Sequence, residues 1–386
     1  MDNMIWSGDI LWLILCILER LLALYAVYHL AEPGIRRLND QITWWSITAK
    51  WWPRHTLPQK ASRDGPMLYE ALPTHPVCIR LLIIEPDSLD RVVRGRLVIR
   101  PLTECTGQYE ALSYVWGSTN DQHEIIVNDC SVSVTRNLLD ALQGLRPRKE
   151  FRVLWIDALC INQDDMEEKG QQVRMMDQIY ACAAEIQIWL GQENDSTAHG
   201  MLALAHLAAV DGSSANTPPR RFIPVERDGL EDILGRVWFS RVWVAQEAAL
   251  ATKATINVGS QSVSWDKTSI FRFLKRLQYA ENMSLWQEGV ACDMRNLRDL
   301  LELGSRLAGS TIKEDLMGAV HERRHLKCVD PRDHIYANLS LAKDAKDFQV
   351  DYTAPVTDVF ERLYHYTRIK YKDMWSGLVE PATTRQ

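Results

Sequence analysis

The sequence contains no closely spaced cysteine pair and no excess of positive charge. Its 8 cysteines are scattered along 386 residues, and none belongs to a C-x-x-C pair. This spacing argues against a cysteine zinc site, and scattered free thiols are typical of a reducing compartment. The formal net charge is −6. A nucleic-acid partner calls for a basic face, so the charge gives no indication of such a partner.

Glycine-rich phosphate loops and internal repeats are also missing. No G-x-G-x-x-G surrounds Gly107 or Gly117, so a dinucleotide site of the Rossmann type is not predicted. Residues 321–325 (HERRH) formally match the zinc-protease pattern H-E-x-x-H. A charged, solvated helix face explains so short a match better, and we predict no metal site. Hydrophobic residues make up 46% of the chain, which is enough for a globular core.

Residues 1–52 differ from the rest in a long apolar run and in their many tryptophans. The stretch 10–31 is long enough to cross a bilayer as a helix, although Glu19 and Arg20 interrupt it. Basic residues follow this stretch and none precedes it, so the positive-inside rule predicts a cytoplasmic location for the remaining chain. The alternative is an apolar helix that packs on another domain or lies in the membrane surface. The proline-rich residues 53–76 are predicted to form a linker.

From residue 77 onward, short apolar runs alternate with amphipathic stretches. We expect strands over 77–84, 95–99, 111–116, 124–127, 131–134, 151–156, 185–190 and 255–258. We expect helices over 136–145, 166–183, 197–210 and 242–251. Thr135 is suited to cap the first of these helices, and Asn128 and Asp129 are typical of a hairpin turn. Strands that alternate with helices favour a parallel sheet covered on both faces, and after residue 264 the pattern is mostly helical.

Three segments place tryptophans, acidic residues and amides at the ends of these strands. They are YEALSYVWGS at 109–118, LWIDALCINQDDMEEKGQQVRMMDQIYACA at 154–183 and RVWFSRVWVAQEAALA at 236–251. In this order they resemble the signature blocks of the fungal heterokaryon incompatibility (HET) domain. DPRDHIYANLSLA at 330–342 and VDYTAPVTDVF at 350–360 resemble the region behind that domain. The resemblance implies a HET domain at 77–260 with its core at 109–250, followed by a helical C-terminal region at 261–386.

This resemblance implies both a fold and a function. HET domains act in fungal non-self recognition, where fusion of incompatible cells triggers death of the mixed compartment. Their core has been likened to the Toll/interleukin-receptor (TIR) domain, so we expect a TIR/flavodoxin-like parallel sheet flanked by helices. We also expect an intracellular signalling protein that works by self-association or with another incompatibility protein. Because the chain shows no NACHT motif and no repeat array, its apolar N-terminal segment is the candidate for membrane placement or oligomerisation. A non-toxic, degenerate family member is the blander alternative.

Some TIR domains hydrolyse NAD with a glutamate early in a helix, which makes a NAD+ nucleosidase the enzymatic alternative. Trp243 and Glu247 stand four residues apart on one predicted helix, so they are expected to share a face. Cleavage of the nicotinamide–ribose bond develops positive charge on the sugar, which the Glu247 carboxylate would stabilise. NAD would then be a substrate, and no resident cofactor is expected.

Seven further residues are candidates for ligand binding. They are Ser113, Trp116, Gly117, Asp157, Asn162, Arg241 and Trp243. A tryptophan would hold the nicotinamide, the aspartate lies at a strand end where open parallel sheets bind ligands, and the serine and glycine could approach a phosphate.

Each candidate also has a structural explanation. Glu247 could cap its helix or pair with Arg241, the tryptophans could be core residues, and Asp157 and Asn162 could satisfy the backbone of a sharp loop. Cys160 has no histidine nearby in the sequence to activate it as a nucleophile.

Overall fold

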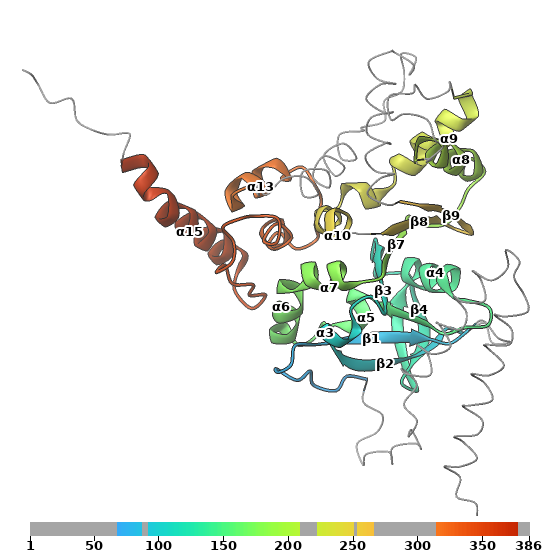
Figure 1. Cartoon of the computed structure of the whole chain (residues 1–386), viewed down its shortest axis with the longest axis horizontal. Coiled ribbons are helices and arrows are strands. Elements are labelled where there is room, and N and C mark those ends of the chain that lie inside the picture. Colours follow the sequence, from blue (N-terminus) through green and yellow to red (C-terminus); the bar gives the residue numbers. More distant parts are fainter. Residues whose placement is uncertain (1–67, 87–91, 209–221, 251–252, 266–313, 377–386) are drawn as a thin grey trace, which may run out of the picture. The chain divides into compact units, whose positions relative to one another are not determined.

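The computed structural model describes residues 68–86, 92–208, 222–250, 253–265 and 314–376 (Figure 1). All of them belong to one compact unit, Asp64–Gln386. The apolar stretch 10–31 and residues 53–67 of the expected linker lie outside the described residues. Within the described ranges, no helix is both long enough and apolar enough to span a bilayer.

One mixed sheet organises the described part of the chain. Its strands are β1 (Cys78–Ile84), β2 (Arg94–Pro101), β3 (Glu110–Tyr114), β4 (Gln122–Val127), β5 (Cys130–Thr135), β6 (Arg152–Trp155), β7 (Glu185–Trp189), β8 (Ala254–Val258) and β9 (Gln261–Ser264). They lie in the order β5-β4-β2-β1-β6-β3-β7-β8-β9. The four neighbours β6, β3, β7 and β8 run parallel.

The expectation of a parallel sheet is confirmed for these four strands and for the pair β2–β4, and it is wrong for the other pairs. The pairs β1–β2, β1–β6, β4–β5 and β8–β9 are antiparallel. For β4–β5 and β8–β9 the reason is connection length, because strands joined by a short turn can only pair antiparallel, whereas parallel neighbours need a long crossover. Only two residues separate β4 from β5, and two separate β8 from β9.

Helices cover the sheet and continue after it. They are α3 (Leu102–Cys105), α4 (Arg136–Leu145), α5 (Asp157–Cys160), α6 (Met166–Arg174), α7 (Met176–Cys182), α8 (Thr197–Ala208), α9 (Pro224–Leu234), the 3-10 helix η1 (Val237–Ser240), α10 (Val244–Leu250), α13 (Leu316–Glu322), α14 (Asp333–Tyr336) and α15 (Val356–Ser376). The expected helical C-terminal region is therefore helical in α13, α14 and α15, with irregular segments between them. The expectations did not include α3, α9 or β9.

Helices α4 and α10 lie against opposite faces of the sheet. Gly144 of α4 faces the ring of Trp189 so closely that an added Cβ would come within 2.8 Å of it. Trp189 pairs in register with Tyr114, and Ser113, the residue before Tyr114, is bonded to Glu247 of α10. Because successive side chains of a strand point to opposite faces, the two helices cover the two sides of the parallel centre.

Two local predictions are confirmed in detail. Asn128 and Asp129 connect β4 to β5 with φ angles of 52° and 62°. Two consecutive positive φ angles are the requirement of the tight turn that suits a twisted hairpin, and Asn and Asp tolerate them. Thr135 caps α4, since its hydroxyl oxygen accepts the backbone N–H of Leu138 at 3.4 Å.

The single helix expected over 166–183 is wrong in one respect, because it breaks at Met175 into α6 and α7. The two halves bind different partners. In α6, Gln172 donates to the carbonyl of Cys78 on β1 at 3.2 Å. In α7, Tyr180 donates to the carbonyl of Leu112 on β3 at 3.2 Å. A straight helix could not satisfy both contacts.

Candidate functional site

A buried chain of hydrogen bonds joins β3 to the segment around α10. The indole N–H of Trp238 donates to the Ser113 hydroxyl at 2.8 Å, and that hydroxyl donates to Oε2 of Glu247. Ser113 is 1% exposed and Glu247 is 2% exposed. The contact therefore joins the first signature block to the third inside the protein, away from solvent.

Burial controls the protonation of Glu247. Loss of solvent raises the pKa of its carboxyl from 4.5 to about 7. The positive charge of Arg241 and hydrogen bonds from Ser113 and Tyr180 oppose this rise, while the negative charge of Asp157 adds to it. A carboxyl that titrates near neutral pH can hold or release a proton under physiological conditions.

The second block reaches the same region through Asp157. This residue follows β6 and begins α5, and Trp116 follows β3, the parallel neighbour of β6. Adjacent parallel strands end at one edge of a sheet, and there the Trp116 indole donates to Oδ2 of Asp157 at 2.8 Å. Burial raises the pKa of Asp157, while Arg241 and the Trp116 hydrogen bond lower it. Arg241 itself donates to the carbonyl of Tyr114 at the end of β3.

The structure thus brings five of the sequence-predicted residues together at the carboxyl ends of β3 and β6. They are Ser113, Trp116, Asp157, Arg241 and Glu247. Trp116 is the exposed member, with 39% of its surface accessible. We refer to these five residues as the polar cluster.

Gly117 and Asn162 serve the backbone around the polar cluster. Gly117 has a φ of 84°, a left-handed conformation that glycine adopts without strain. The backbone N–H of Asn162 donates to Oε1 of Glu168 at 2.7 Å, and its side-chain oxygen accepts the amide of Asp164 at 3.3 Å. In the described contacts, Asn162 therefore satisfies its own loop, which agrees with its structural explanation.

Trp243 accepts the backbone N–H of Glu247 at 3.1 Å through its carbonyl, but its side chain has other partners than the Glu247 carboxyl. It lies one residue before α10, and its side chain packs with the apolar cluster formed by Val242, Leu326 and Ala337. A hydrogen bond also links it to Asp333, a residue far downstream. The helix starts later than periodicity suggested, because η1 and a turn occupy the residues before it.

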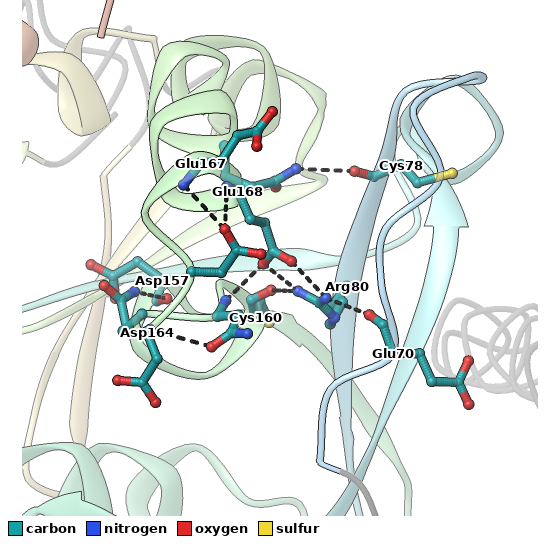
Figure 2. A network of polar contacts seen from close by, with 12 residues as sticks. Glu70, Cys78, Arg80, Asp157, Cys160, Asp164, Glu167 and Glu168 are labelled. Atoms are coloured by element: carbon teal, nitrogen blue, oxygen red, sulfur yellow. Dashed lines mark hydrogen bonds and ion pairs between the residues drawn. The ribbon is translucent and has the colours of Figure 1, made fainter. Parts of the chain in front are cut away.

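An ion pair that the sequence reasoning missed holds the loop that carries Asp157. Figure 2 shows Arg80 of β1 next to Glu168 of α6. The two terminal guanidinium nitrogens of Arg80 donate to Oε1 and Oε2 of Glu168, at 2.5 Å and 2.8 Å. Arg80 also donates to the carbonyl of Cys160 at 3.2 Å and to that of Glu70 at 2.5 Å. A lone arginine in an otherwise apolar strand (CIRLLII) is a signal that could have predicted a buried acidic partner.

Two rejected candidates can be judged from their surroundings. Cys160 is fully buried, and burial raises the pKa of its thiol to about 12, so little nucleophilic thiolate forms. His321 lies in α13, but the helix ends at Glu322, so His325 falls beyond it and the i,i+4 face of a zinc helix is not formed. Among the described residues, no group of histidine, cysteine and carboxylate side chains could hold a metal ion.

The fold and the polar cluster define an α/β domain whose three signature blocks meet at one edge of its sheet. Residues 109–247 match the family described as "Heterokaryon incompatibility protein (HET)". The chain therefore carries a domain of the heterokaryon incompatibility family.

A curated relative, "Heterokaryon incompatibility protein 6, OR allele" of Neurospora crassa, is 28% identical over 320 residues. The alignment covers 64% of this chain and 45% of the relative, so the chain spans about half the length of that protein. No solved structure matches the chain.

Proposed function

We propose that this chain acts in fungal heterokaryon incompatibility, where its HET domain transmits a programmed cell-death signal through self-association or with another incompatibility protein. The family match and the name of the Neurospora relative support the role in incompatibility. The single observation that carries the proposal is the convergence of the three blocks on the polar cluster. Its central members, Ser113 and Glu247, are almost fully buried. A satisfied buried polar network favours one fixed conformation, which a module that recognises partners through its surface requires.

Inducible expression of the full chain in a filamentous fungus tests this proposal. We expect growth arrest and dye uptake on induction, together with concentration-dependent assembly of the purified protein. Ser113→Ala leaves Glu247 without its hydroxyl donor and should weaken both effects. Ser131→Ala makes the same change on edge strand β5 and is the control. A soluble, well-expressed wild-type chain that causes no growth defect would contradict the proposal and favour a degenerate family member.

The protonation of Glu247 favours a second candidate, a TIR-like NAD+ nucleosidase. A pKa near 7 in a carboxyl beside a guanidinium and a second carboxyl is typical of catalytic groups. In this proposal the four parallel strands β6, β3, β7 and β8 correspond to the centre of a TIR/flavodoxin-like sheet. Glu247 stabilises the positive charge that develops on the ribose, and the exposed Trp116 stacks on the nicotinamide. NAD is the substrate, and it reaches Glu247 only if neighbouring side chains move aside.

Free nicotinamide is the measurement that separates the two candidates. The assembled wild-type protein is incubated with NAD, and the products are separated by chromatography. A hydrolase should lose activity by about 100-fold or more in Glu247→Gln, the size of effect expected when a charge-stabilising group is removed. Glu167→Gln, at an exposed position on α6, is the control. Killing retained by Glu247→Ala, with no nicotinamide from either protein, favours signalling by assembly alone.

We propose further that residues 10–31 hold the protein at a membrane with the HET domain on the cytoplasmic side. The apolar length of the stretch and the basic residues after it support this proposal. Fractionation of fungal cells tests it. The full chain should sediment with membranes, and a chain lacking residues 1–52 should not. Equal distribution of the two chains would contradict the anchor.

A further inference from the structure

A segment beyond the HET match contacts the domain in two places. Residues 326–354, which we refer to as the strap, lie outside the matched residues 109–247. We infer that the strap covers Trp243 and Lys169 of the HET domain in a closed state. We infer further that this closed state restrains the domain's cell-death signalling. The restraint rests on the cell-death function proposed above, whereas the closure depends only on the contacts of the strap.

The first attachment is to the turn between η1 and α10. The amide of Val242 donates to the carbonyl of Lys327 at 3.0 Å, and the amide of Lys327 donates to the carbonyl of Ser240 at 2.6 Å. This pair of bonds is an isolated parallel bridge beside Arg241 of the polar cluster. Leu326 and Ala337 of the strap pack on the Trp243 ring.

The second attachment is to α6. Arg174 donates to the carbonyl of Lys346 at 2.8 Å. Gly170 faces the strap so closely that an added Cβ would lie 3.2 Å from the carbonyl oxygen of Val350. The ammonium of Lys169 lies 4.6 Å from the centre of the Tyr352 ring, a cation–π distance. Helix α6 is the helix that Arg80 ties to β1, so this attachment is on a firmly held element.

One hydrogen-bonded group links the two attachments. The phenol of Tyr352 donates to Oδ1 of Asp333 at 2.8 Å, and a hydrogen bond joins Asp333 to Trp243. Arg332 holds this part of the strap in shape, because it pairs with Asp330 and donates to the carbonyl of Tyr352 at 2.7 Å. The strap thus engages an aromatic ring and a cation that border the polar cluster.

Release of the strap breaks these contacts but no pairing between the strands of the sheet, because none of the strands β1 to β9 lies in residues 326–354. Between the strap and the matched residues these contacts are hydrogen bonds, one cation–π contact and the apolar cluster at Trp243, while strap side chains such as Ile335 and Phe348 are also buried. Local opening of such a segment requires much less free energy than global unfolding. Opening would remove the strap from Trp243 and from Lys169, whose charge lowers the pKa of Asp157 in the polar cluster against the rise caused by burial. A partner or a ligand that binds the open state would shift the equilibrium towards it.

Alkylation of Cys328 measures opening, because this thiol is half-buried against the same apolar cluster. Tyr352→Phe removes the hydroxyl that bonds to Asp333 but keeps the ring beside Lys169. We expect Cys328, followed by peptide-resolved mass spectrometry in the full chain, to react about fivefold faster in this variant. Asp333→Ala should have a larger effect once each rate is divided by the measured thiolate fraction, because, besides burial, the Asp333 carboxylate raises the pKa of the Cys328 thiol. Tyr364→Phe makes the same change at a tyrosine that is 56% exposed on α15, and it should match the wild type.

The outcome that overturns closure is wild-type reactivity of Cys328 in both strap variants. If Asp333→Ala fails to fold, as judged by circular dichroism, Tyr352→Phe alone decides. Restraint is tested by the expression level at which the chain kills fungal cells, which should fall for Tyr352→Phe and stay unchanged for Tyr364→Phe. Opened variants that kill no better than a lethal wild type overturn the restraint. Absence of killing by every chain, wild type included, instead contradicts the proposed function, and with it the restraint.

Discussion

Replacing Glu247 with glutamine should remove a large part of the pH dependence of the domain's stability. Burial raises the pKa of this carboxyl from 4.5 to about 7 in the folded protein. Between these two pH values the folded state keeps a proton that the unfolded state has lost. The stability contributed by the protonated group is therefore fully present below about pH 4.5 and is lost as the pH rises to about 7.

The size of the effect follows from the pKa difference. At about 1.36 kcal/mol per pKa unit, the whole change corresponds to roughly 3 kcal/mol, of which roughly 2 kcal/mol falls between pH 5 and pH 7.5. No discount for solvent screening is needed, because Glu247 is 2% exposed. Glutamine keeps the shape of the side chain and an acceptor for the Ser113 hydroxyl, but it cannot ionise.

Urea unfolding of the full chain at pH 5 and pH 7.5 measures this effect. The wild type should lose roughly 2 kcal/mol more than Glu247→Gln between the two pH values. The carboxyls of Glu110, Asp157 and Asp333, whose pKa values are also raised by burial, titrate in both proteins and largely cancel. Glu167→Gln should follow the wild type. Parallel pH profiles for the wild type and Glu247→Gln would refute the reasoning.

Three further substitutions test the packing around the site by urea unfolding at pH 7. Arg80→Ala leaves Glu168 buried and unpaired and should cost about 3–5 kcal/mol, and a loss below 1 kcal/mol would contradict a buried pair. Gly200→Ala puts a Cβ 2.2 Å from a carbonyl oxygen of α9 and should cost about 1–3 kcal/mol, and no loss would contradict the close approach of α8 and α9. Thr135→Ala removes the cap of α4 and should cost about 1 kcal/mol; no loss would mean that the cap is dispensable.

Sequence patterns predicted the elements whose stabilising contacts are local. The Asn128–Asp129 turn and the Thr135 cap depend on the conformation and hydrogen bonds of a few neighbouring residues, and β7 could be recognised from its own short apolar run. The sequence also placed Trp116 at the end of one expected strand and Asp157 just after another. Adjacent parallel strands end at the same edge, whatever the details of packing.

Contacts between distant segments could not be predicted in the same way. Arg80 and Glu168 are 88 positions apart, and nothing local in either segment selects the other. Periodicity placed Trp243 and Glu247 one helical turn apart, but it did not predict that the Trp243 side chain contacts Asp333 while Glu247 contacts Ser113. The direction of a side chain at a helix start depends on what packs against it, and here that is a segment about 90 residues away.

The chain's own sequence determined its local elements, its three signature blocks and its match to the HET family over residues 109–247, since these depend on residue identity and short-range order. Tertiary structure alone decided that the sheet is mixed, that Glu247 is buried beside Ser113, and that residues 326–354 lie on Trp243 and Lys169. Burial is a property of the assembled protein, because it depends on which distant groups exclude water from a side chain. The pKa of Glu247 and the closure by the strap follow from that exclusion, so neither can be predicted from one segment of the sequence.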